Sequence, residues 1–142
     1  MAEGEGIGSA WKIIPSLSSR NIAATVEFYT SELGFTLGGT KSVNDDDSQL
    51  YFCSLYAGKK ATANIYFFLR DDSEFHLGGV MIALGTAGLD HFHDLLIARG
   101  NVKVVEAIRD TPWGYRQFTI KDNDGNRLTF FKYLEGGNPG TN

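Results

Sequence analysis

A chain of 142 residues with 42% hydrophobic and 21% charged residues has the size and composition of one globular domain. Its formal net charge of −4, without any basic run, disfavours nucleic acids and anionic membranes as partners. A single cysteine excludes an internal disulfide and a multi-cysteine metal site. Because no apolar run reaches the ~18 residues of a membrane span and no secretory signal is evident, we expect a cytoplasmic protein.

Both ends of the chain, residues 1–10 and 136–142, are rich in glycine and polar residues and predict disordered tails. Between them, Trp11–Leu17 is apolar and β-branched and predicts a first strand, with Pro15 at an edge. A helix follows, because apolar residues recur at intervals of three and four behind Asn21, which can cap its start. The apolar stripe and the glycine that ends this helix are Ile22, Val26, Tyr29, Leu33 and Gly34.

Three strands complete a first unit, and then the same order of elements restarts. The three strands are Phe35–Thr40, Gln49–Tyr56 and Ala61–Arg70, with an acidic loop at Asn44–Ser48. The second unit comprises a strand at Gly79–Leu84, a helix that begins at Thr86 or Gly88 and stops at Gly100, a strand at Lys103–Arg109, and a hairpin of Tyr115–Lys121 and Arg127–Tyr133 around Asp122–Gly125.

This order predicts an α+β fold of paired βαβββ modules that form a curved mixed sheet with the helices outside. The single domain should span residues 11–135, with one module at about 11–70 and the other at about 78–135. Each module is a small sheet with one helix, which cannot bury its apolar face alone. The two halves are therefore expected to lie side by side and to share a core.

The last hairpin predicts which face of the sheet is buried. One set of alternating residues is uniformly apolar and should pack under a helix: Phe118, Ile120, Leu128 and Phe130. The other set mixes aromatic and polar groups, which is typical of a concave ligand cleft: Tyr115, Gln117, Thr119, Arg127, Thr129 and Phe131. A solvated outer face is the alternative interpretation of this second set.

Two stretches of the chain carry recognisable motifs. The first is Ile14–Leu17 followed by Arg20–Tyr29 and the tripeptide Leu33–Phe35, and the second is Pro112–Phe118 followed by Lys121–Phe130. Together they resemble the glyoxalase/bleomycin-resistance/dioxygenase superfamily, the vicinal oxygen chelate proteins, and the second stretch is most similar to bleomycin-resistance proteins. The resemblance implies paired βαβββ modules, a homodimer, and clefts between a first and a second module.

The resemblance also raises the question of a metal. Enzymes of this superfamily bind a divalent metal through four His, Gln or Glu side chains, whereas bleomycin-resistance proteins hold no metal and sequester a cationic glycopeptide. The aligned positions in this chain hold side chains that are poor ligands for a hard divalent ion, namely Ile14, Tyr66, Met81 and Thr129. We therefore predict a cleft without a metal or any other cofactor.

Other reactive side chains are expected to be structural. His91 and His93 lie two residues apart on a predicted helix and point in different directions, and His76 lies between the modules, so we expect surface histidines. Asp45–Asp47 lacks the ligand spacing of a calcium loop and predicts a solvated loop. Cys53 lies among apolar residues with no histidine near it in sequence, which predicts a buried side chain without nucleophilic function.

Trp113 stands in a Pro-Trp-Gly turn before a strand. By resemblance it matches the aromatic side chain that stacks on the drug in bleomycin-resistance proteins, and the alternative is a structural plug at the end of the sheet. We expect no catalytic residue. The expected ligand-binding residues are Trp113, Tyr115, Asn64, Tyr66, Phe68, Met81, Thr129, Phe131 and Arg127.

The leading hypothesis is a dimeric, metal-free binding protein of the bleomycin-resistance type, which would confer antibiotic resistance by sequestering an amphipathic aromatic small molecule such as a cationic glycopeptide. The alternative is a metal-independent enzyme of the same fold, for instance a lyase or isomerase of secondary metabolism. Its candidate residues would be Tyr66, Tyr115, Arg116 and Arg127, although no histidine or carboxylate is expected on the cleft strands. A glyoxalase or dioxygenase is disfavoured by the missing metal ligands.

Overall fold

The chain builds the same βαβββ unit twice, as the computed structural model shows for residues 6–59, 62–85 and 88–136. The first unit consists of β1 (Ser16–Ser19), α1 (Ile22–Glu27) continued by the π-helical segment η1 (Phe28–Glu32), β2 (Thr36–Val43), β3 (Asp46–Ala57) and β4 (Ala63–Leu69). The second unit consists of β5 (Gly79–Ala83), α2 (Gly88–Arg99), β6 (Lys103–Asp110), β7 (Tyr115–Lys121) and β8 (Arg127–Tyr133).

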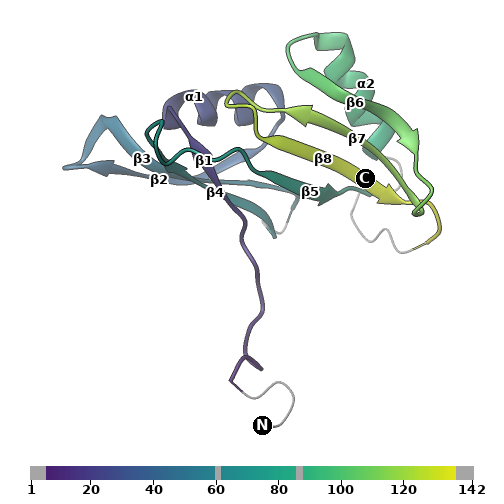
Figure 1. Cartoon of the computed structure of the whole chain (residues 1–142), viewed down its shortest axis with the longest axis horizontal. Helices are drawn as coiled ribbons and strands as arrows, with labels where there is room; N and C mark the ends of the chain where they lie inside the picture. The colour runs from purple at the N-terminus through teal and green to yellow at the C-terminus, as the bar shows by residue number, and fades with distance from the viewer. Residues whose placement is uncertain (1–5, 60–61, 86–87, 137–142) are drawn as a thin grey trace.

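Each unit forms its own four-stranded mixed sheet, in the order β1-β4-β3-β2 for the first and β5-β8-β7-β6 for the second. In both sheets the first strand of the unit pairs in parallel with the last, and the other pairs are antiparallel. Both helices cover the same side of the sheets (Figure 1). The predicted α+β fold of paired modules is thereby confirmed.

The first helix follows the predicted pattern. The side chain of Asn21 accepts a hydrogen bond of 2.9 Å from the backbone N–H of Ala24 and caps the helix. Gly34 takes a positive φ of 76°, which favours glycine and ends the helical segment. Ile22, Tyr29 and Leu33 are buried and Val26 is partly buried, so the predicted stripe does face the first sheet.

The hairpin of β7 and β8 has the predicted bounds and the predicted buried face. Phe118, Ile120, Leu128 and Phe130 are all buried in the core. Cys53 is completely buried as well, and burial raises the pKa of its thiol to about 12, so the thiolate is not formed near neutral pH. No helix among the described residues is long and apolar enough to cross a membrane.

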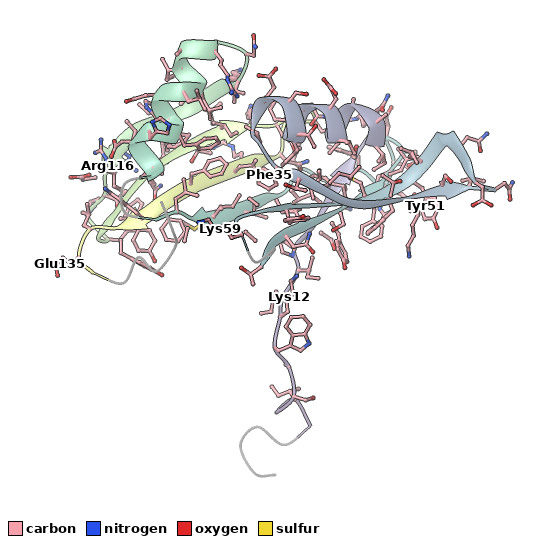
Figure 2. All side chains as sticks on the ribbon, turned by 180° about the vertical axis from the view of Figure 1, so that it is seen from behind. Lys12, Phe35, Tyr51, Lys59, Arg116 and Glu135 are labelled. Atoms are coloured by element: carbon pink, nitrogen blue, oxygen red, sulfur yellow. The ribbon has the colours of Figure 1, made fainter. Side chains whose placement is uncertain are left out.

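The first strand is shorter than expected. β1 begins at Ser16, and the prediction of a strand from Trp11 was wrong for the residues before Ser16, which form an extended arm that leaves the sheets on the side opposite the helices (Figure 1). Figure 2 shows Lys12 on this arm, away from both sheets. Because Ser16 pairs in parallel with Tyr66, β4, which starts at Ala63, could offer partners as far back as Ile13 but none to Trp11 and Lys12. Pro15 has no N–H to donate and interrupts the ladder before Ile13 and Ile14.

Smaller differences occur at other boundaries. The acidic loop is a tight turn, because Asn44 and Asp45 have positive φ values of 53° and 58° and β3 already begins at Asp46. The second helix begins at Gly88, and the alternative start at Thr86 lies outside the described residues, as does Ala61, the predicted start of β4.

A buried hydrogen-bond cluster joins the two units. The carboxylate of Asp122, in the turn between β7 and β8, accepts hydrogen bonds from the Tyr29 hydroxyl at 2.7 Å and from the backbone N–H groups of Asp124 and Asn126 at 2.9 Å. Asn126 continues the cluster by donating to Ser18 in β1 at 3.1 Å and to Asp122 at 3.1 Å. Burial raises the pKa of Asp122, although the hydrogen bonds from Tyr29 and its neighbours oppose that shift.

Candidate ligand-binding cleft

Each sheet has an open face, which we define as the side opposite the helices. On the first sheet the open face carries Phe52, Ser54, Asn64, Tyr66 and Phe68, whereas the intervening residues are buried in the core. On the second sheet it carries Met81, Tyr115, Gln117, Thr119, Thr129, Phe131 and Tyr133.

The open face of the first sheet is an aromatic platform. The Phe52 ring lies 5.0 Å from that of Tyr66 and 5.2 Å from that of Phe68, centroid to centroid. The side-chain amide of Asn64 is held by hydrogen bonds of 2.9 Å to Ser54 Oγ and to the backbone carbonyl of Leu55. A groove of about 510 Å³ runs over this platform. Its lining is Gly38, Gly39, Thr40, Lys41, Tyr51, Phe52, Ser54, Tyr66 and Phe68.

Two cations stand over the platform. Lys41 Nζ lies 5.4 Å from the Phe52 ring centroid, and the Arg70 guanidinium lies 5.3 Å from that of Phe68. Such cation–π contacts keep the charged groups close to the apolar surface. The predicted residues Asn64, Tyr66 and Phe68 are therefore brought together, in an environment with a positive rim.

The open face of the second sheet has an aromatic cluster of its own. Tyr115 stacks on Phe131 with centroids 4.8 Å apart and an interplanar angle of 22°, and Tyr133 meets both rings edge-on. Thr129 lies beside Met81 on the neighbouring strand, and its hydroxyl is 2.8 Å from that of Thr119. Four more of the predicted ligand-binding residues thus share one surface: Tyr115, Phe131, Thr129 and Met81.

Trp113 lies in the turn that leads into Tyr115 of this second surface. The turn that carries it is closed by hydrogen bonds of 2.7 Å between Thr111 N–H and the Tyr115 carbonyl and of 3.2 Å between Gly114 N–H and the Thr111 carbonyl. The Trp113 side chain is 56% exposed and its ring lies 5.3 Å from the Arg109 guanidinium. More than half of the indole is therefore exposed among the described residues, which favours a ligand contact over a structural plug.

Arg127 stands apart from the other predicted residues. It begins β8 at the end next to the β7–β8 turn, while Tyr115 and Tyr133 pair at the opposite end of the hairpin. Seven residues of strand separate these ends, which corresponds to about 20 Å.

A cavity of about 330 Å³ lies at the seam between the two sheets and connects predicted residues of both units. Asn64 from the first unit and Met81 from the second both line it. The rest of the lining is Ile13, Pro15, Phe35, Thr62, Ala63, Ile65, Val80, Ile82 and Ala83.

One open-face side chain was not anticipated, the carboxylate of Glu106. Glu106 Oε1 accepts hydrogen bonds from Gln117 Nε2 at 2.9 Å and from Thr119 Oγ1 at 3.1 Å. Its other oxygen lies 3.3 Å from Arg109. The pKa of Glu106 is held below its ordinary value, mainly by the hydrogen bond from Gln117, so this carboxylate is ionised at neutral pH.

A β-bulge explains why the sequence pattern did not reveal Glu106. Val104 pairs with Ile120, whose side chain is buried under the helix, and strict alternation would place Glu106 on that buried face too. A register shift between Val104 and Glu106 turns the carboxylate to the open side. The sequence had not placed β6 among the cleft strands, and the bulge is the reason that its carboxylate was missed.

The metal-ligand positions implied by the superfamily do not fit a hard divalent cation. Tyr66 pairs with Ser16, so Ser16 takes the place on β1 that the sequence had suggested for Ile14. The four positions then hold Ser16, Tyr66, Met81 and Thr129, which offer hydroxyls and a thioether in place of imidazole or carboxylate. Within the described parts of the chain, no group of three or more His, Cys, Asp or Glu side chains could hold a metal ion.

Solved structures from several bacteria share this fold. TioX from Micromonospora sp. ML1 is 15% identical with a TM-score of 0.69, and the match covers 87% of this chain and 99% of that one. A glyoxalase-related enzyme from Clostridium phytofermentans is 19% identical with a TM-score of 0.70, and the match covers 87% of this chain and 95% of that one. TnmS3 from Streptomyces sp. CB03234, described as an antibiotic binding protein, is 21% identical with a TM-score of 0.64. The match covers 87% of this chain and 98% of that one.

These identities are low, so the similarity establishes the shared fold and no more. Among curated proteins, none matches this chain in sequence. A family description does match, over residues 15–130, which includes every strand except the last three residues of β8 and nearly all of the open-face residues described above. The chain therefore belongs to the Glyoxalase/Bleomycin resistance protein/Dioxygenase superfamily.

Proposed function

We propose that this protein binds an aromatic small molecule, without a metal, in a cleft formed by the open faces of its sheets, and that sequestration of that molecule protects against an antibiotic. The observation that carries the proposal is the aromatic surface on both open faces. Phe52, Tyr66 and Phe68 on one sheet, and Tyr115 and Phe131 on the other, alternate with the core residues that lie under the helices. Aromatic walls with a few fixed polar groups are typical of small-molecule sites.

The related structures are compatible with this proposal and with enzymatic function. TnmS3 is described as an antibiotic binding protein, and the Clostridium protein as a glyoxalase-related enzyme, so the fold alone does not distinguish binding from catalysis. The residues of the site favour binding, because the positions that would hold a catalytic metal carry Ser16, Met81 and Thr129 in place of histidine or glutamate.

We further propose that a second copy of the chain completes the cleft. Met81 and Trp113 are 55% and 56% exposed in the single chain, Met81 beside Thr129 on the second open face and Trp113 in the turn that leads to Tyr115. Exposed apolar surface of this kind indicates an interface or a binding site. A two-fold dimer would place the open face of one sheet opposite that of the partner's other sheet and enclose a ligand between them.

The assembly can be measured directly. Light scattering during size-exclusion chromatography should give about twice the 15.6 kDa chain mass at micromolar concentration. A mass equal to that of one chain would contradict the dimeric cleft and leave only open, half-formed sites.

A thermal-shift screen tests the binding function. The panel contains bleomycin as a cationic glycopeptide, planar aromatic antibiotics, and Ni²⁺, Zn²⁺, Fe²⁺ and Mn²⁺ salts. A compound present at 100 times its Kd should stabilise the folded protein by about 2.7 kcal/mol. We expect a shift with an aromatic compound in the presence of a chelator.

The Phe52→Ala variant supplies the control for this screen, because Phe52 lies between the two other rings of the first open face. It should lose the shift while its unliganded protein still folds. Stabilisation by a metal salt alone, or about one tightly held metal ion per chain in the purified protein, would contradict the metal-free proposal.

The second candidate is a metal-independent enzyme, and the observation that favours it is Glu106 on the open face. A general base works best when its pKa lies near the operating pH. The hydrogen bonds from Gln117 and Thr119 instead keep the pKa of Glu106 low, so this carboxylate is suited to accept hydrogen bonds and not protons. We therefore rank binding above catalysis.

A further inference from the structure

The polar cluster on the second open face has a defined direction of hydrogen bonding. Glu106 is ionised and can only accept, so the group of Gln117 that faces it at 2.9 Å must be the amide nitrogen. This assigns the orientation of the Gln117 amide, and its Oε1 points away from the carboxylate. Within the described part of the chain, Oε1 is a buried acceptor that receives no hydrogen bond, in a residue that is only 7% exposed.

The two threonines extend the same direction. Thr119 lies 3.1 Å from Glu106 Oε1 and must donate its only hydroxyl hydrogen there. The short contact of 2.8 Å between Thr119 and Thr129 then requires Thr129 to be the donor. The hydroxyl hydrogens of both threonines are thus used within the cluster.

Apart from the second N–H of the Gln117 amide, the groups that remain at this surface are acceptors. They are the oxygen Oε1 of Gln117, the lone pairs of the Thr129 hydroxyl and the carboxylate of Glu106. The Glu106 side chain is still 31% exposed and Thr129 is partly exposed, so these two residues can be reached from the open face, whereas Gln117 Oε1 is buried. Arg109 lies beside the outer oxygen of Glu106 and offsets its charge, so the cluster selects for hydrogen-bond donors more than for charge.

An aromatic surface adjoins these acceptors directly. Gln117 pairs across the strands with Phe131, whose ring stacks on Tyr115. A buried carbonyl without a donor is unfavourable, and a bound group that supplies an N–H relieves this cost. The neighbouring ring surface can hold the planar part of the same molecule.

We propose that Gln117, Thr129 and Glu106 form an acceptor site for an N–H donor group, such as an amide or amidine, attached to an aromatic ring of the ligand. This inference rests on the proposed binding function and adds a requirement to it: the ligand presents hydrogen-bond donors to the second sheet. Donor recognition specifies the molecule more strictly than stacking, because an acceptor in the same place would face Glu106 and the Gln117 oxygen.

Three isosteric probes test the requirement: benzamide, benzamidine and benzoate. They share one ring and differ in the planar group, which is a neutral donor, a charged donor or an acceptor. Binding to the full-length protein is followed by ¹H–¹⁵N NMR, with the side-chain amide of Gln117 and the backbone of Thr119 and Thr129 as reporters. We expect benzamide and benzamidine to bind at least about tenfold more tightly than benzoate. Comparison of the two donors reveals whether positive charge adds affinity.

Matched variants assign the effect to the cluster. Thr129→Val removes the hydroxyl with little change in shape and should reduce the preference for benzamide over benzoate severalfold. Thr36→Val makes the same change at an exposed position of β2 in the other sheet and should leave the preference unchanged. Gln117→Leu, if it folds, should abolish the preference altogether.

Each remaining outcome overturns the inference. Equal or tighter binding of benzoate, which Arg109 could mediate, would show that the site does not select hydrogen-bond donors. If all three probes then shift the NMR signals of Tyr115 and Phe131, the aromatic cleft of the proposed function is still supported. If none of the probes shifts the reporters, the acceptor site does not bind N–H groups, while the thermal-shift screen still decides whether the protein binds aromatic molecules elsewhere.

Discussion

Replacement of Asp122 by alanine is expected to lower the free energy of unfolding by about 3–5 kcal/mol, because it removes a buried charged acceptor from its donors. The carboxylate accepts hydrogen bonds from the Tyr29 hydroxyl, two backbone N–H groups and the Asn126 amide. Tyr29 is completely buried, so water cannot take over as the partner of its hydroxyl. Chemical denaturation, followed by circular dichroism, measures the loss.

Tyr29→Phe is the matched control for this prediction. It removes one donor, keeps the ring against Phe35 and Phe67, and leaves Asp122 with three donors, so a cost of about 1–2 kcal/mol is expected. A larger loss for Tyr29→Phe than for Asp122→Ala would mean that the carboxylate does not hold the two units together. Since Tyr29 follows α1 in the first unit and Asp122 lies in the second, we expect both units to unfold in one transition.

Trp113→Ala should weaken ligand binding by about 1–3 kcal/mol, the range for loss of an aromatic stack, with little effect on folding. The physical reason is exposure: the indole is 56% exposed, and the turn beneath it is closed by backbone hydrogen bonds that the substitution leaves intact. The compound that raises the melting temperature most in the screen serves as the ligand, and calorimetric titration measures its Kd.

Trp11→Ala is the control, because Trp11 is 86% exposed and precedes β1, which begins only at Ser16. It should leave ligand affinity unchanged, and in this background the fluorescence of Trp113 should be quenched by the ligand. A loss of about 3 kcal/mol or more in the stability of Trp113→Ala, with unchanged affinity of the folded protein, would restore the structural-plug interpretation.

The sequence by itself determined the secondary elements and their order. In β7 and β8, the alternation of Phe118 and Ile120 with polar residues identified the buried face, because side chains of a strand point to opposite sides in turn. The Asn21 cap and the glycine after Leu33 delimited the first helical segment for equally local reasons. Periodicity and capping depend only on residues that are close together in the sequence, so they can be recognised without the tertiary structure.

The same local rules identified some site residues. Asn64, Tyr66 and Phe68 alternate with core residues of β4, so their shared open face followed from the strand period alone. The motifs that resemble the superfamily include features set by neighbouring residues and features set by contacts between distant segments. The turn at Asp122–Gly125 was evident from its residue types, but its attachment to Tyr29 was not.

Only the tertiary structure decided the features that depend on contacts between distant segments. Glu106 reaches the open face because a bulge against β7 reverses the alternation, and pairing register is a property of two strands. Trp11–Ile14 reads as a strand, yet Pro15 interrupts the pairing with β4, and Trp11 and Lys12 lie beyond the start of that strand, so the segment remains an arm. The acceptor character of Gln117 and Thr129 likewise arises from their hydrogen bonds to Glu106 and Thr119. A single sequence encodes which groups can accept or donate, but only the fold decides which of them are already satisfied.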